Sequence, residues 1–426
     1  MREREDSARG RLSLPHRLLA QVPWGPLAAL AAAAALVAFG IAGIGRHGAH
    51  INGDMRFLYA AGKAWLSGHN PYLLEDIVLT TPPSLELNFV QLGFTFAYPP
   101  QSSWLSMALA ALPLRAASIA MVLLNLAATG TLAWFTVRLA ALPGTGTSGK
   151  EQAPERTELT RLLVWFVPVV VLGSPFTQHV LFMGQTSLLA VALLSAGWHY
   201  TVTGRSPWLP GILLGASTLK PQLVVLPLLL LLLDRRFAVL AVAAGTALLC
   251  AAPALIINGP LTSVHTWLGA LDLYRQGDVQ VAGFQHVFGV QSLFASAGIH
   301  LPNLFPLGLV VVFALWRSER FTSCERLGLA LAASALFIYS HDYDLAGLAP
   351  LFAALWIVTR SSNAQALIVL VALAGLFVPQ RALRVSLAGP ALHWRECILL
   401  ALVLWRIVAS RTRGPALEYP AVTETG

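Results

Sequence analysis

Asp54 is the first residue of this chain whose type and position suggest chemistry. Charged residues make up only 11% of the 426 residues, and 56% are hydrophobic. A carboxylate beside a long apolar stretch can act as a general base that takes a proton from a hydroxyl group. The alternative is that Asp54 caps the N-terminus of a helix, a position that aspartate favours.

Lys220 is the second candidate, because it is the only charged residue between Arg205 and Asp234. Pro221 follows it and lacks the backbone N–H that a continuous helix needs, so we expect a broken helix here. An ammonium group at such a break suits a phosphate group, because it is a compact charge with three donors. The alternative is a lysine that reaches the membrane surface along its flexible stem.

His341, Asp342 and Asp344 form the third cluster, at the end of an apolar stretch. Two acids and a histidine can bind a sugar, hold a metal ion or assist proton transfer, and the alternative is a hydrated helix end. The His-x-x-Asp spacing without further ligands is a weak metal signal, so we expect no metal site, although a divalent ion is chemically possible. Three cysteines show neither disulfide nor zinc spacing: Cys250, Cys324 and Cys397.

The elements that must position these residues are apolar helices. A soluble domain carries roughly 25% charged residues, more than twice the fraction found here. The composition therefore excludes an ordinary cytosolic enzyme and a disordered chain, and it favours a polytopic membrane protein. The net charge of +8 is typical of basic residues in cytoplasmic loops. Because no nucleic-acid-binding motif accompanies that charge, we do not expect a nucleic acid partner.

Uncharged runs of about 20 residues predict membrane-spanning helices. The run at 18–45 is too long for a signal peptide, and the run at 162–204 fits two spans with folds at Ser174-Pro175 and Gly184-Gln185. We count about 12 spans with both chain ends inside if 206–233 is one broken span, whereas a hairpin there moves one end across. The predicted layout is a cytoplasmic tail at 1–23, one membrane domain at 24–410 with outer loops at 46–100 and 258–300, and a cytoplasmic tail at 411–426.

The first outer loop is expected to hold an amphipathic helix. In residues 54–66, apolar residues recur at helical spacing against Asp54, Arg56 and Lys63. This pattern predicts a helix that lies in the membrane interface. The expected fold class is therefore an all-α polytopic membrane protein with an outward-facing amphipathic helix.

Several short motifs occur in an order that resembles one known family. They are the stretch at 54–72, then Tyr98-Pro99-Pro100, Gly184-Gln185, Lys220-Pro221 and Gln291-Ser292. Each motif is weak alone, but their order and spacing over residues 30–380 resemble glycosyltransferase family 87. The resemblance implies a GT-C type fold.

The resemblance also implies an activity, an inverting transfer of a hexose, commonly mannose, from a polyprenyl-phosphate donor. The acceptor would be a lipid or a glycan on the extracytoplasmic face of the inner or plasma membrane, among membrane lipids, and no nucleotide sugar is needed. The sequence indicates no cofactor and leaves a metal requirement open. By this resemblance Asp54 is the catalytic base and Lys220 lies near the donor phosphate. The charge of the leaving phosphate also suggests a contribution from Arg56 or Arg275. The other expected substrate-binding residues are Tyr98, Gln185, Gln291, His341, Asp342 and Asp344.

Two other functions remain open on sequence alone. A transporter or flippase of lipid-linked sugars would have broken helices in both halves of the chain, and this sequence has one. A polymerase or ligase of surface polysaccharides would share the lipid-linked donor and carry a large arginine-rich outer loop, of which 379–396 is a modest version. Family members of mycobacteria carry a histidine pair where this chain has His341 to Asp344, so the sugar and the acceptor also stay open.

Overall fold

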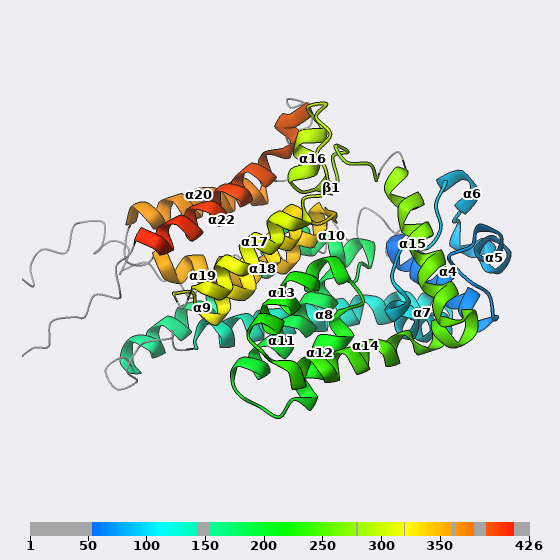
Figure 1. Cartoon of the computed structure of the whole chain (residues 1–426), viewed down its shortest axis with the longest axis horizontal. Helices are drawn as coiled ribbons and strands as arrows, with labels where there is room; N and C mark the ends of the chain where they lie inside the picture. The colour runs from blue at the N-terminus through cyan, green and yellow to red at the C-terminus, as the bar shows by residue number, and fades with distance from the viewer. Residues whose placement is uncertain are drawn as a thin grey trace, which may run out of the picture.

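The computed structural model describes residues 53–142, 153–277, 280–318, 320–359, 363–378 and 389–412. The predicted tail at 1–23, the predicted span at 18–45, the beginning of the first outer loop and residues 413–426 lie outside the described residues. In the described ranges the chain is helical apart from one short antiparallel ladder, which pairs β1 (Val287–Phe288) with β2 (Ser340–His341). The expectation of an all-α fold is confirmed for these residues (Figure 1).

The helices follow one another along the chain with short connections. In order they are α4 (Gly53–Leu66), α5 (Leu74–Thr80), η3 (Pro83–Leu85), α6 (Phe89–Leu92), η4 (Pro100–Ser102), α7 (Ser103–Ala110), α8 (Leu114–Ala140), α9 (Ala153–Gly173), α10 (Pro175–Met183), α11 (Ser187–Val202), α12 (Trp208–Ser217), α13 (Pro221–Leu233), α14 (Phe237–Asn258), α15 (Pro260–Gln276), α16 (Val290–Ala295), α17 (Phe305–Arg317), α18 (Ser323–Phe337), η5 (Asp342–Leu348), α19 (Ala349–Thr359), α20 (Asn363–Phe377), η6 (Gly389–His393) and α22 (Trp394–Thr412).

Two of the described helices, α8 and α14, are long and apolar enough to cross a membrane. A third candidate joins Leu163–Gly173 to α10, with a bend of 54° between them. The other apolar helices, among them α11, α12, α13 and α17, have 10 to 17 residues. The structure therefore supports a membrane protein with two or three clear spans among the described residues, and the count of about 12 stays a prediction.

The predicted helix break at Lys220 is confirmed. Helix α12 ends at Ser217, and α13 begins at Pro221. Between them Lys220 has φ −132° and ψ 76°, which is not helical. Proline fits the first position of a helix because the N–H it lacks would have no partner there. The direction of the chain across the membrane at this point stays a prediction.

The predicted helix of the first outer loop is α4, but its apolar face is covered by protein. Met55, Leu58 and Trp65 are almost fully buried. Gly62 lets α4 approach α7 closely, since a Cβ atom there would lie 2.1 Å from the backbone oxygen of Ser106. Leu66 at the end of α4 is exposed, and most other exposed apolar side chains of this segment lie on α5 and α6. The position of α4 in the membrane interface stays a prediction.

Helices α11 and α18 form the centre of the molecule. Both bury side chains on all faces, which is typical of helices that are surrounded by other helices. The beginning of α11 and the segment after the end of α18 lie close together, because η5 packs against both α10 and α11. This end of the central pair faces helices α4 and α15 (Figure 1).

Candidate active site

A cavity of about 590 Å³ lies between helices α4 and α15 and the central helices. Its wall comes from α4, the segment before η4, α10, the α12–α13 break, α15, the segment at 280–291 and the end of α18. This volume lies within the range of about 300–1,000 Å³ that is usual for small-molecule sites. Seven of the residues that the sequence associated with the site line the cavity: Asp54, Tyr98, Gln185, Lys220, Arg275, Gln291 and His341.

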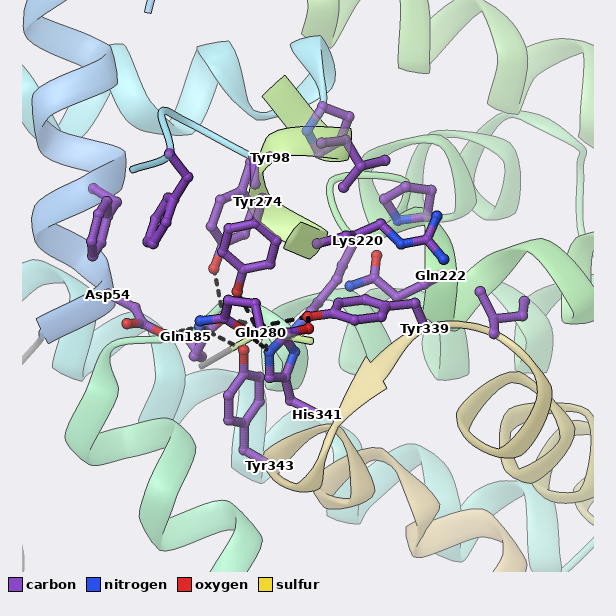
Figure 2. Close-up of a pocket in the computed structure, with 18 of the residues that line it drawn as sticks. Asp54, Tyr98, Gln185, Lys220, Gln222, Tyr274, Gln280, Tyr339, His341 and Tyr343 are labelled. Carbon is purple, nitrogen blue, oxygen red and sulfur yellow. Dashed lines mark hydrogen bonds between the residues drawn. The ribbon is translucent and has the colours of Figure 1, made fainter. Parts of the chain in front are cut away.

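Gln185 connects the polar groups of the cavity wall. Its amide nitrogen donates to the carboxylate of Asp54 and, at 3.1 Å, to Tyr343 Oη. Its carbonyl oxygen accepts from Tyr98 Oη at 2.5 Å and from Lys220 Nζ at 3.5 Å. An amide has two N–H donors and two acceptor lone pairs, so this network uses its full capacity. Figure 2 shows the result, with Asp54 and Tyr343 both turned toward Gln185.

The Gly184-Gln185 motif is the turn that aims this side chain into the cavity. Gly184 ends α10 with φ +66°, a left-handed conformation that glycine adopts without strain. The backbone N–H of Gln185 then bonds to Val180 O, and α11 begins at Ser187. The break that the sequence predicted here is confirmed, and it places an amide beside Asp54.

Lys220 is held by a buried carboxylate. Its ammonium nitrogen lies 2.5 Å from Asp344 Oδ1 and 2.6 Å from Ser187 Oγ, and 4.6 Å from the ring centre of Tyr343. The other oxygen of Asp344 accepts from the backbone N–H of His341 at 3.1 Å. Asp344 is only 1% exposed and does not line the cavity. The ion pair therefore balances the charge of Lys220 before any substrate binds.

Asp54 lies in the first turn of α4 and faces the cavity. Shielding from water raises the pKa of this carboxyl, although the hydrogen bond from Gln185 and the charges of His179 and Lys220 act in the opposite direction. A carboxylate with a raised pKa takes a proton more readily than an exposed one. The geometry is therefore compatible with both roles that the sequence left open for Asp54. Asp54 lies at the start of α4, where it can cap the helix, and it also faces the cavity, where it can act as a base.

His341 is a buried, neutral ring at the floor of the cavity. Burial lowers the pKa of its imidazole to about 4. The ring stacks on Tyr343 at 5.0 Å with an interplanar angle of 4°, and Nε2 lies 2.7 Å from Gln280 Oε1. Because Gln280 Oε1 can only accept, the neutral imidazole carries its proton on Nε2.

Asp342 forms a second charged group just behind the cavity wall. Its carboxylate lies 3.6 Å from His179 Nδ1, 3.5 Å from His286 Nδ1 and 3.8 Å from an Arg395 nitrogen. Burial disfavours its ionisation, but the contacts with the two histidines outweigh this effect and hold the pKa of Asp342 well below its usual range. Among the described residues, no group of three or more His, Cys, Asp or Glu side chains has a metal-binding arrangement.

Two arginines that the sequence associated with the donor phosphate lie in different places. Arg275 lines the cavity, and its guanidinium lies 5.3 Å from the ring centre of Tyr339. No ion pair involves Arg275 within the part of the chain that the structure describes. Arg56 donates to Leu85 O at 3.1 Å, lies 3.6 Å from Glu86, and is not part of the cavity wall.

Comparison with known families agrees with this arrangement. The model of glycosyltransferase family 87 matches residues 96–376, which is more than half of the chain. The chain belongs to glycosyltransferase family 87. The resemblance inferred from the motifs is thus confirmed, and the protein is a membrane glycosyltransferase with a sugar donor and an acceptor. No curated protein and no solved structure matches the chain significantly.

The family match covers most of the cavity of this glycosyltransferase, but Asp54 lies before the matched range. Tyr98, Gln185, Lys220 and residues 341–344 all fall inside it. The cavity therefore joins the family-matched part of the chain to α4, and the hydrogen bond between Gln185 and Asp54 is one direct contact between the two.

Sequence reasoning missed several polar residues of this glycosyltransferase cavity. Gln280 follows α15 and Tyr339 follows α18, and no spacing marks either residue as part of a site. His179 could have been noticed, because it is an ionisable residue within the uncharged run at 162–204. The lining also includes an apolar part that the motifs did not predict: Leu219, Pro221, Val225, Trp267, Leu271, Phe305, Phe337 and Ile338.

Proposed function

We propose that this family 87 glycosyltransferase moves a hexose, with mannose favoured, from a polyprenyl-phosphate donor to a hydroxyl group of a lipid or glycan. The observation that carries the proposal is the composition of one cavity wall. It combines a carboxylate of raised pKa at Asp54, an arginine at Arg275 and an apolar surface. These three features correspond to the acceptor hydroxyl, the donor phosphate and the isoprenoid tail.

Asp54 acts as the general base in this proposal. The acceptor oxygen loses its proton to the Asp54 carboxylate while it attacks the anomeric carbon. The phosphate leaves from the opposite face of the sugar, so a single displacement inverts the anomeric configuration. The amide of Gln185 fixes the position of the carboxylate through their hydrogen bond.

The leaving phosphate is already an anion, so it needs positive charge more than a proton. Lys220 supplies little net charge, because Asp344 balances it at 2.5 Å. Arg275 lines the same cavity and stacks on Tyr339. We therefore assign the phosphate contact first to Arg275, whose planar guanidinium suits phosphate oxygens. Lys220 is assigned a supporting contact.

The apolar part of the wall suits the isoprenoid tail of the donor. Val225 of α13, Phe305 of α17 and Phe337 of α18 lie on three different helices around it. A tail that leaves between such helices reaches the hydrocarbon region of the membrane directly. The sugar then lies at the polar wall, and we place this wall on the extracytoplasmic side of the inner or plasma membrane, within a single membrane domain at 24–410.

The alternatives differ in what the cavity does. Membership of a glycosyltransferase family disfavours a transporter or flippase of lipid-linked sugars. A polymerase or ligase of surface polysaccharides would use the same donor chemistry and differ only in the acceptor. The proposal therefore commits to the donor class and leaves the acceptor as a lipid or glycan hydroxyl.

The donor class can be tested with purified protein in lipid nanodiscs. Radiolabelled polyprenyl-phosphate mannose, polyprenyl-phosphate glucose and a nucleotide-linked mannose are offered separately, each with a lipid extract as acceptor. We expect label in the acceptor fraction with a polyprenyl-phosphate sugar and none with the nucleotide sugar. Transfer from the nucleotide sugar alone would contradict the proposal.

A further inference from the structure

The charged group around Asp342 has a feature that the proposed displacement does not use. Two of its members, His179 and His286, line the cavity, whereas Asp342 lies behind them and is only 8% exposed. Each histidine turns Nδ1 toward the Asp342 carboxylate. This leaves Nε2 as the nitrogen of each ring that points away from Asp342.

His179 is the member of this group whose helix packs against the helix of the proposed base. It belongs to α10, which packs against α4 near the start of that helix. A Cβ atom on Gly53 would lie 3.6 Å from Met183, one turn along α10 from His179, and His179 and Asp54 line the same cavity. The ring of His179 also packs edge-on against Tyr343 at 5.4 Å, so its orientation is fixed from two sides.

Arg395 fixes the other side of the Asp342 carboxylate. It comes from the first turn of α22, donates to Val378 O at 2.7 Å and lies 4.8 Å from the ring centre of Phe176. An arginine with its own backbone partner cannot turn freely toward the cavity. The group is therefore a rigid support for the two imidazoles, built from helices that are far apart in the sequence.

Each turnover in the proposed mechanism leaves a proton on Asp54. Asp54 lies in the cavity wall and is only partly exposed, so its proton leaves through the water and the side chains of the cavity. The base must lose that proton before the next cycle. A neighbouring imidazole that is held by a carboxylate is well suited to accept it, because the carboxylate stabilises the imidazolium that forms.

We propose that His179 relays the proton from Asp54 to water, and that Asp342 is its positioning residue. This inference rests on the proposed role of Asp54. The acceptor O–H bond breaks as the new C–O bond forms, and the proton goes to the Asp54 carboxylate. The Asp54 O–H bond then breaks as an N–H bond forms at His179 Nε2, directly or through one water. The imidazolium keeps its Nδ1–H toward Asp342 and releases the Nε2 proton to water at the cavity mouth.

The test compares His179→Ala and His179→Gln in the nanodisc transfer assay. Glutamine keeps an amide N–H donor near the position of His179 Nε2 but cannot carry a proton. We expect kcat to fall by about 100-fold in both variants, with the KM for the donor unchanged. Added imidazole should restore the alanine variant, which has space for it, and leave the glutamine variant inactive. His265→Ala is the matched control, because His265 lies on α15 and outside this cavity. We expect this variant to keep the wild-type kcat, with or without added imidazole.

The outcomes separate the relay from the base. A His179→Gln variant with the kcat of the wild-type protein would overturn the relay, and so would an alanine variant whose loss imidazole does not reduce. If His179→Ala does not fold, the near-isosteric glutamine variant still decides. Full activity in His179→Gln together with an inactive Asp54→Asn would reject the relay and leave the proposed base intact.

Discussion

The buried pair of Lys220 and Asp344 gives the most quantitative prediction. Lys220→Met removes the ammonium group and leaves the Asp344 carboxylate 1% exposed. Removing one partner of a buried ion pair costs about 3–5 kcal/mol. Asp344 keeps hydrogen bonds from Ser187 Oγ at 2.6 Å and from the backbone N–H of His341 at 3.1 Å. We therefore expect the lower end of that range, about 3 kcal/mol of unfolding free energy.

A double-mutant cycle measures this pair in the purified protein. Lys220→Met, Asp344→Asn and the double variant are unfolded with denaturant, and their free energies are compared with that of the wild-type protein. We expect the double variant to lose less than the sum of the single losses, by about 2 kcal/mol. A coupling energy below about 0.5 kcal/mol would refute the inference that the two charges balance each other.

The same double variant tests the assignment of the phosphate contact. Its cavity has the same net charge as that of the wild-type protein, because one positive and one negative group are removed together. If Arg275 makes the main phosphate contact, the double variant keeps the strong charge-assisted hydrogen bonds to the donor. The KM for the donor should then change by less than about threefold. A large rise in the donor KM would instead assign the phosphate to Lys220.

Three further predictions address other residues. Arg275→Gln should raise the donor KM by about 10-fold to 100-fold, the loss expected for a hydrogen bond to a charged group. Arg205→Gln, on the exposed surface, should leave the donor KM unchanged. Equal donor KM values in the two variants would contradict the assignment of Arg275. Gln185→Glu should move the acid limb of the kcat–pH profile to higher pH. The reason is that the base works deprotonated, and a second carboxylate beside Asp54 raises the pKa of Asp54 further. An unchanged profile would argue against Asp54 as the base. Gly62→Val should lower the unfolding free energy by about 1–3 kcal/mol, because the valine side chain would meet the backbone of α7. Denaturant unfolding of this variant at wild-type stability would disprove the close approach of α4 to α7.

The local breaks of this fold were predictable because they depend on neighbouring residues. Proline after Lys220 and glycine before Gln185 each end a helix by their own backbone chemistry, and both breaks occur where expected. The helix that begins near Asp54 was predictable for the same reason, from the spacing of its apolar residues.

The partners across the cavity were not predictable, because they depend on contacts between distant parts of the chain. Lys220 and Asp344 are separated by 124 positions, and Gln185 and Asp54 by 131. A local pattern shows that a charge is expensive beside lipid, but it does not show which other charge compensates it. The number of membrane spans stays a prediction, because several apolar runs fold into helices of 10 to 17 residues.

The central claim is that Asp54 is the base of a sugar transfer in this cavity, and one comparison tests it most directly. The rate of transfer from a polyprenyl-phosphate sugar is measured for the wild-type protein and for Asp54→Asn, with donor binding measured in parallel. Asparagine keeps the shape of aspartate but cannot take a proton. We expect kcat to fall by about 100-fold or more in Asp54→Asn while donor binding persists. Transfer by Asp54→Asn at the wild-type rate would contradict it.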